Sequence, residues 1–120
     1  MFKIAFTIIS TAKNSERIND LLHSIAHVYN ISTDEISAKP YPKFENSYKT
    51  EFVIHSPIES FAEINFKTIE LSQLLGSPWL LYFDNDTQCL ELIFNKNTNS
   101  KHHKDIFETI FWAQIVVVKL

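Results

Sequence analysis

Apolar residues recur at every second position in three segments of the chain, which predicts β-strands there. The first segment is near residues 2–9, and the second, near 48–55, has one wetter face. The third, 110–119, carries β-branched residues at both sets of positions. It is therefore expected to be a central strand that is mostly buried on both faces.

Two further apolar runs, near residues 79–84 and 88–95, are separated by a short polar turn. That spacing is typical of a β-hairpin. The tryptophans Trp79 and Trp112 fall on predicted strands, and both are expected in the core rather than at a ligand. Residues 95–104, NKNTNSKHHK, are expected to form a polar loop.

Apolar residues at helical spacing predict a helix near 15–29, capped by Asn14 or Ser15. Its apolar stripe consists of Ile18, Leu21, Leu22, Ile25 and Tyr29. Between this helix and the second strand, residues 30–47 are polar and contain two prolines. A short helix near 34–38 or a functional loop would account for this long connection.

The segment Ser56-Pro57-Ile58-Glu59 predicts the start of a second helix near 57–75. Ser at the N-cap, Pro at the first helical position and Glu at the third make a capping box. Gly76 stands where a C-terminal cap is expected. The apolar face of this helix is expected to carry Ile58, Phe61, Ala62, Phe66 and Ile69.

The order of elements is strand, helix, strand, helix and then three strands. This order predicts an α+β fold, with a mainly antiparallel five-stranded sheet and the helices on one face. A chain of 120 residues fits one domain, spanning 1–120, and its 45% apolar and 21% charged residues are typical of a globular protein. The single Gly argues against a phosphate-binding loop, and no cofactor is expected.

Cys89 is the only cysteine, so no internal disulfide forms and a reducing, cytoplasmic location is expected. The apolar N-terminus is too short to cross a membrane. The net charge is −3, and residues 51–100 hold seven acidic residues against two lysines. A nucleic-acid-binding protein would carry a basic stripe, and this chain has none. Its acidic middle favours a cationic partner.

Asp84-Asn85-Asp86-Thr87 follows an apolar strand and resembles the first motif of the haloacid-dehalogenase phosphotransferases. In that family the first Asp is the nucleophile and the second is the acid/base. The family's usual Gly after the second Asp is absent, and the 34 residues after Asp86 cannot hold the remaining βαβ units. A hairpin turn explains the segment better, since Asp and Asn favour tight turns.

Other candidate chemistry has simpler interpretations. His23 and His27, four residues apart, could bind a metal together with Asp20, but a solvated helix face explains them. His102 and His103 fit a flexible basic loop. Cys89 fits a core or hairpin position better than a nucleophile, because its sequence neighbours are acidic or apolar.

The segments PWLLYFDNDTQCLELIFNKN and IFWAQIVVVKL resemble the hairpin and closing strand of several immunity proteins from bacterial contact-dependent growth-inhibition and polymorphic-toxin systems. The small, acidic, single-domain α+β character is similar as well. The resemblance implies a non-enzymatic protein that binds one cognate toxin domain, often a nuclease, in a 1:1 complex without nucleic acid or membrane. The expected partner-binding residues are the acids Asp84, Asp86, Glu59, Glu63 and Glu70.

Two alternatives remain open at this stage. One is a small α+β ligand-binding or regulatory domain that dimerises through its sheet. The other is a metal-dependent hydrolase that uses Asp84, Asp86 or the histidines.

If the DNDT segment is only a turn, the chain should show no metal binding or phosphatase activity there. We expect neither Zn²⁺ nor Mg²⁺ to bind at physiological concentrations, and we expect no phosphatase activity. Isothermal calorimetry with each ion is the measurement. Micromolar affinity that is abolished by Asp84→Asn or His23→Ala would contradict the prediction.

Overall fold

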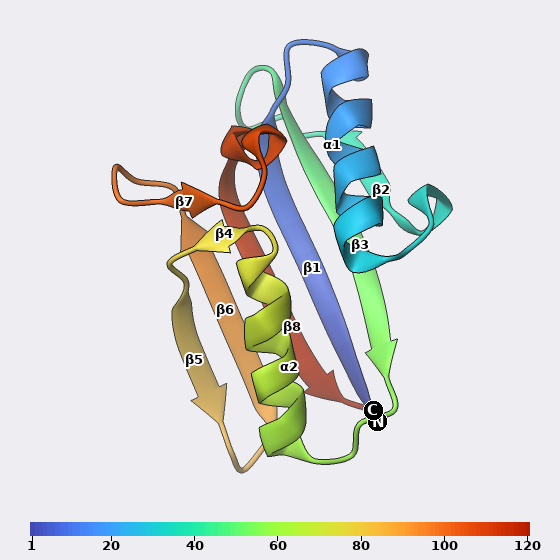
Figure 1. Ribbon diagram of the computed structural model, residues 1–120, viewed down its shortest axis with the longest axis vertical. Helices are drawn as coiled ribbons and strands as arrows, with labels where there is room; N and C mark the ends of the chain where they lie inside the picture. Colours follow the sequence, from blue (N-terminus) through green and yellow to red (C-terminus); the bar gives the residue numbers. More distant parts are fainter.

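Two helices lie on one face of a six-stranded antiparallel sheet (Figure 1). The computed structural model describes residues 1–120. The strand order is β2-β3-β1-β8-β6-β5. The bounds of these strands are β1 (Phe2–Thr11), β2 (Ser37–Pro40), β3 (Ser47–Ser56), β5 (Leu80–Asp84), β6 (Cys89–Asn95) and β8 (Ile110–Lys119).

The helices are α1 (Ser15–Tyr29) and α2 (Phe61–Gln73). In Figure 1, α1 lies over the β3 side of the sheet, whereas α2 lies over the β8 and β6 side. Two short 3₁₀ turns are present, η1 (Thr33–Glu35) and η2 (Asp105–Thr109). A separate two-stranded sheet pairs β4 (Gly76–Ser77) with β7 (Lys101–His102).

The α+β class and the mainly antiparallel sheet are confirmed, but the sheet has six strands rather than five. The additional strand is β2, which lies in the polar connection and pairs with β3. Only four residues long and mostly exposed, it has no hydrophobic alternation that could reveal it in the sequence. Its pairing depends on the free edge that β3 offers after folding. Similarly, β7 lies in the segment interpreted as a loop.

The core lies between the helices and the facing side of the central strands β1 and β8. Phe6 stacks on Phe52 with ring centroids 4.4 Å apart, and its centroid is 5.0 Å from that of Tyr29. The Tyr29 hydroxyl donates to the Leu71 carbonyl at 2.8 Å, which joins α1 to α2. Burial raises the pKa of Tyr29 above its ordinary range, so this hydroxyl keeps its proton.

The other face of the sheet is only partly covered. The expectation that residues 110–119 are mostly buried on both faces is correct only for the helix side, because β8 is buried there and half-buried on the other face. Trp112 therefore lies half-buried on the outer face, not in the core. Trp79, just before β5, does pack inward, with its ring centroid 5.5 Å from that of Phe94.

The first helix matches its sequence prediction. The Asn14 side chain accepts a hydrogen bond from the Arg17 backbone N–H at 3.0 Å, which caps the N-terminus. The helix ends at Asn30, whose φ of 54° is the left-handed conformation of a C-cap.

The second helix starts later than its sequence prediction. Ser56 is the last residue of β3 and pairs with Phe2, so the capping box at 56–59 does not form. The helix is capped instead by Ser60, whose side chain accepts from the Glu63 backbone N–H at 3.3 Å. The sheet register decides between these two similar Ser-x-x-Glu signals, because pairing with β1 keeps Ser56 extended.

The predicted apolar face of α2 is buried only in part, because Ile58 and Phe61 pack against the core and the later residues do not. The helix buries Ile64, Thr68 and Ser72, whereas Phe66 and Ile69 are 67% and 38% exposed. Thr68 is tolerated inside because its hydroxyl donates to the Ile64 carbonyl at 2.8 Å. A helix with apolar residues on several sides can bury only some of them, and the sheet determines which.

Gly76 is not a helix cap. It belongs to β4, and a Cβ atom at this position would lie 2.4 Å from the backbone oxygen of Lys101 on β7. The glycine is required for the close approach of these two strands. No helix in the structure is both long and apolar enough to cross a membrane.

The contrast between Phe6 and Phe66 gives a stability prediction. Phe6→Ala should lower the free energy of unfolding by about 3–5 kcal/mol, because it opens a cavity in the aromatic core. Phe66→Ala should change it by no more than about 0.5 kcal/mol, because that ring is mostly exposed. Urea denaturation of both variants is the measurement. A similar loss for both would show that Phe66 is buried in solution.

Candidate functional site

The edge strand β5 exposes apolar side chains on both of its faces. The exposed fractions are 55% for Leu80, 45% for Leu81, 56% for Tyr82 and 64% for Phe83. Cross-strand pairing places Leu81 and Phe83 on the helix side of the sheet, opposite buried residues of β6. Leu80 and Tyr82 therefore face the other side.

The exposed side of α2 continues this apolar surface. Ile69 and Leu81 border one shallow groove of about 270 Å³, with the buried Leu92 also lining it. Phe66 lies one turn before Ile69 on the same side of the helix. We call the surface formed by Phe66, Ile69 and Leu80–Phe83 the α2–β5 surface.

The two edges of the sheet differ in how they are protected from pairing with another chain. The β2 edge is short and carries Lys39 and Pro40, two features that discourage strand addition. The β5 edge has neither Lys nor Pro within its five residues. Because β5 pairs only with β6, its outer backbone groups are free to bond a partner.

Four of the five predicted partner-binding acids border the α2–β5 surface. Asp84 ends β5, and Asp86 lies in the turn that follows; both are exposed. Glu63 and Glu70 are exposed on α2, seven residues apart and therefore on one side of the helix. The β5–β6 turn and the start of α2 lie at the same end of the molecule (Figure 1).

Glu59 is placed differently from the other four acids. Its carboxylate lies 2.8 Å from the N-terminal amino group of Met1, in a fully exposed position before α2. The hydrogen bond and positive charge of that amino group lower the pKa of Glu59, with a smaller contribution from Lys119. Glu59 therefore already has a cationic partner within the chain.

The DNDT segment forms the hairpin turn. Asp84 pairs with Cys89, so the residues between them connect the antiparallel strands β5 and β6. The Asp84 carboxylate accepts a hydrogen bond from the Asp86 backbone N–H at 2.9 Å. One aspartate thus holds the turn that presents the other to solvent, which confirms the interpretation of this segment as a turn.

The remaining candidate residues are dispersed. His23 and His27 are exposed on α1, while Asp20 lies 3.6 Å from Arg17. Cys89 is half-buried at the start of β6. His102 lies on β7, where its ring packs edge-on near Phe94, with centroids 6.2 Å apart. No group of three or more His, Cys, Asp or Glu side chains is arranged to hold a metal ion.

Sequence reasoning missed the exposed apolar residues of α2 and β5, because it placed Phe66 and Ile69 on one apolar helix face and interpreted residues 79–84 only as a hairpin strand. Two signals in the sequence could have revealed them. Residues 61–71 place apolar side chains on more sides of a helix than one sheet can cover. Residues 80–83 are uniformly apolar, whereas their hairpin partner alternates, as expected when only one of the two strands is covered.

The chain matches no protein-family model, and the searches of curated proteins and of solved structures also gave no match.

Proposed function

We propose that this chain is an immunity-type inhibitor that binds one cognate, cationic toxin domain, such as a nuclease, in a 1:1 complex. The α2–β5 surface is the contact region in this proposal, and the chain catalyses no reaction of its own. Binding takes place in the cytoplasm, where Cys89 remains reduced. The observation that carries the proposal is the exposed apolar edge strand with acids at its border.

The composition of the α2–β5 surface supports a protein partner. Monomeric proteins rarely leave large contiguous apolar patches exposed, and such patches rimmed by polar residues are typical of protein interaction sites. Six of the chain's ten exposed large apolar residues lie on α2 and β5. Aromatic residues such as Phe66, Tyr82 and Phe83 are the side chains that most often anchor interfaces.

The border of the surface supports a cationic partner. Asp84, Asp86, Glu63 and Glu70 are exposed, and only Lys67 is interspersed among them on α2. Nuclease active sites are cationic because they hold phosphates, so an acidic inhibitor accelerates association and disfavours other partners. In this arrangement the apolar centre provides affinity and the acids provide steering.

The free β5 edge favours a second candidate, a ligand-binding or regulatory domain that dimerises through its sheet. An antiparallel pairing of two β5 strands would be self-complementary, as a two-fold dimer requires. The same pairing would bring two acidic α2 helices together, and like charges at an interface are unfavourable. The oligomeric state of the free chain, measured by light scattering, separates the two candidates.

Growth protection tests the proposal. The toxin domain encoded beside this chain is expressed with the wild-type chain or with the variant Phe66→Gln, Phe83→Thr. The wild type should protect the cells, and the variant should not, because it loses two aromatic anchors of the interface. Val53→Thr, which alters an exposed apolar residue of β3, is the matched control and should protect fully.

Each variant is first checked for unchanged thermal unfolding. Loss of protection only by a folded α2–β5 variant supports the proposal. Full protection by that variant would show that the toxin binds elsewhere, and no protection by the wild type would contradict the immunity function itself.

The role of the acids is tested by association kinetics. Asp84→Lys with Asp86→Lys should slow association with the toxin domain and flatten its dependence on salt, because rim charges act mainly on the association rate. If either acid is buried against a toxin Lys or Arg, its removal should also lower the affinity by about 2–5 kcal/mol. The rates are measured by surface-based kinetics at low and high salt.

The control is Asp34→Lys with Glu35→Lys, a change of equal charge on η1, which lies away from β5. It should leave association nearly unchanged. Equal slowing by both pairs would show that net charge alone matters, and unchanged association in the first pair would exclude the turn from the recognition surface.

A further inference from the structure

An open cavity of about 580 Å³ lies on the outer face of the sheet, on the side away from the helices. Its volume is in the range of small-molecule sites, which is about 300–1,000 Å³. The cavity is separate from the α2–β5 surface, because none of its lining residues belongs to α2 or β5. Half of the residues that line it are apolar, and most of these are aromatic.

The floor of the cavity is a row of residues that the sheet register sets side by side. Lys49 of β3 pairs with Ile9 of β1, Ile9 pairs with Trp112 of β8, and Trp112 pairs with Asn95 of β6. Neighbouring strands are about 4.8 Å apart, so this row crosses four strands. The apolar floor formed by Ile9 and Trp112 therefore has the cation of Lys49 at one end and the amide of Asn95 at the other.

A loop between β2 and β3 forms the wall of the cavity at one end. It contributes Tyr41, Lys43 and Phe44, and the Phe44 ring packs edge-on against Phe111 at 5.8 Å. The backbone N–H of Tyr41 donates to the Ser47 carbonyl at 2.8 Å, and the Ser47 hydroxyl donates back to the Tyr41 carbonyl at 3.2 Å. The wall is therefore held in place by the strand that follows it.

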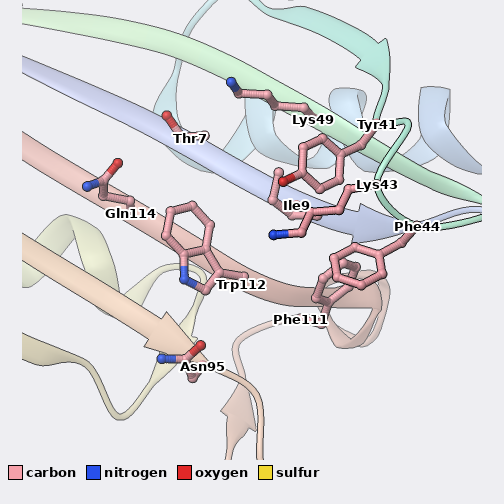
Figure 2. A pocket seen from close by; sticks show the side chains of 10 residues that line it. All are labelled: Thr7, Ile9, Tyr41, Lys43, Phe44, Lys49, Asn95, Phe111, Trp112 and Gln114. Carbon is pink, nitrogen blue, oxygen red and sulfur yellow. The ribbon is translucent and has the colours of Figure 1, made fainter.

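The charge of the cavity is opposite to that of the chain as a whole. Lys43 and Lys49 line it, and no acidic side chain does. Lys49 is 4.0 Å from Glu51, whereas Lys43 makes no ion pair and lies 5.9 Å from the centre of the Phe44 ring. In Figure 2 the Lys43 side chain extends toward Trp112, with the Tyr41 hydroxyl on the same side.

Polar groups at the edge of the floor complete the site. Gln114 pairs with Thr7 across the sheet, and its amide nitrogen donates to the Glu91 carboxylate at 2.5 Å. That bond orients the Gln114 side chain and leaves its carbonyl oxygen to accept a hydrogen bond from a ligand. Asn95 offers both a donor and an acceptor at the other end of the row.

From this geometry we infer that the cavity binds a small planar aromatic molecule that carries one anionic group, a phosphate or a carboxylate. The ring stacks on Trp112 over the Ile9 floor, and the anion pairs with the Lys43 ammonium. Gln114 and Asn95 bond polar edges of the ring. This inference is independent of the proposed toxin binding, because the two surfaces share no residue.

Calorimetry with four probes tests the inference on the whole chain. Adenosine monophosphate and indole-3-acetate each combine a planar ring with an anion, whereas adenosine has only the ring and inorganic phosphate has only the charge. At least one of the first two should bind at least about tenfold more tightly than either of the last two, because a charged hydrogen bond contributes about that much. The tighter of the two shows which of these combinations of ring and anion the cavity prefers.

Variants locate the binding. Trp112→Ala should weaken it about tenfold, as for other aromatic stacking platforms, and Trp112→Phe should restore most of it. Lys43→Gln should weaken it about tenfold, whereas the control Lys67→Gln, on the helix side of the sheet, should have no effect. Thermal unfolding of each variant confirms that it is folded.

Three results would overturn the inference. The first is an absence of binding by either planar anion at millimolar concentration. The second is equal affinity for adenosine and its monophosphate together with no binding of indole-3-acetate, because charge then plays no part. The third is binding that is unchanged in the folded variants Lys43→Gln and Trp112→Ala, which would place the ligand elsewhere.

Discussion

Two helices can cover only part of a six-stranded sheet, and this limit shapes the α2–β5 surface. A helix with its side chains is about 10–12 Å across, while strands are about 4.8 Å apart, so two helices cover about four strands. Among the strands of this sheet, only the four central ones contribute buried apolar residues to the core. The outer strands β2 and β5 are left over, and the sequence treats them in opposite ways. β2 is short and polar, whereas β5 is apolar and unprotected.

The uncovered strand β5 lies beside a side of α2 that also exposes apolar residues. The helix buries Ile64, Thr68 and Ser72, which are modest in size and partly polar, and turns Phe66 toward solvent. This arrangement is unfavourable for an isolated domain, because exposed aromatic surface gains nothing from folding. It would become favourable in the proposed complex, in which a partner covers β5 and the adjoining side of α2. The acids around this region then restrict the partners to those with a complementary charge.

The lining of the cavity on the opposite face of the sheet has the reverse electrostatic character. There the cavity has two lysines and no lining acid, within a chain whose net charge is −3. The helix-side part of the α2–β5 surface and this cavity are separated by the thickness of the sheet, so occupation of one does not sterically exclude the other. Strands β6 and β8 lie between the two sites. Their inner residues form the core beneath α2, and their outer residues line the cavity.

The sequence by itself determined the elements whose signals are local. Asn14 caps α1 through its own side chain, the alternation of residues 2–9 sets β1, and Asp84 and Asp86 form the hairpin turn through a bond between near neighbours. These features need no distant contact, because period and cap chemistry act within a few residues. The acids of the candidate site were identified for a similar reason, since exposed charge is the usual state of Asp and Glu.

Tertiary structure alone decided the features that depend on contacts between residues distant in sequence. Pairing with Phe2 made Ser56 a strand residue and moved the helix cap to Ser60. The free edge of β3 recruited β2, and Gly76 serves a contact with Lys101, which is distant in sequence. Phe66 and Trp112 are apolar in any context, yet one is exposed and the other lines a cavity. The hydrophobicity of a side chain shows only that it favours burial. The interior of the packed fold is limited in space, and it determines which apolar side chains are buried.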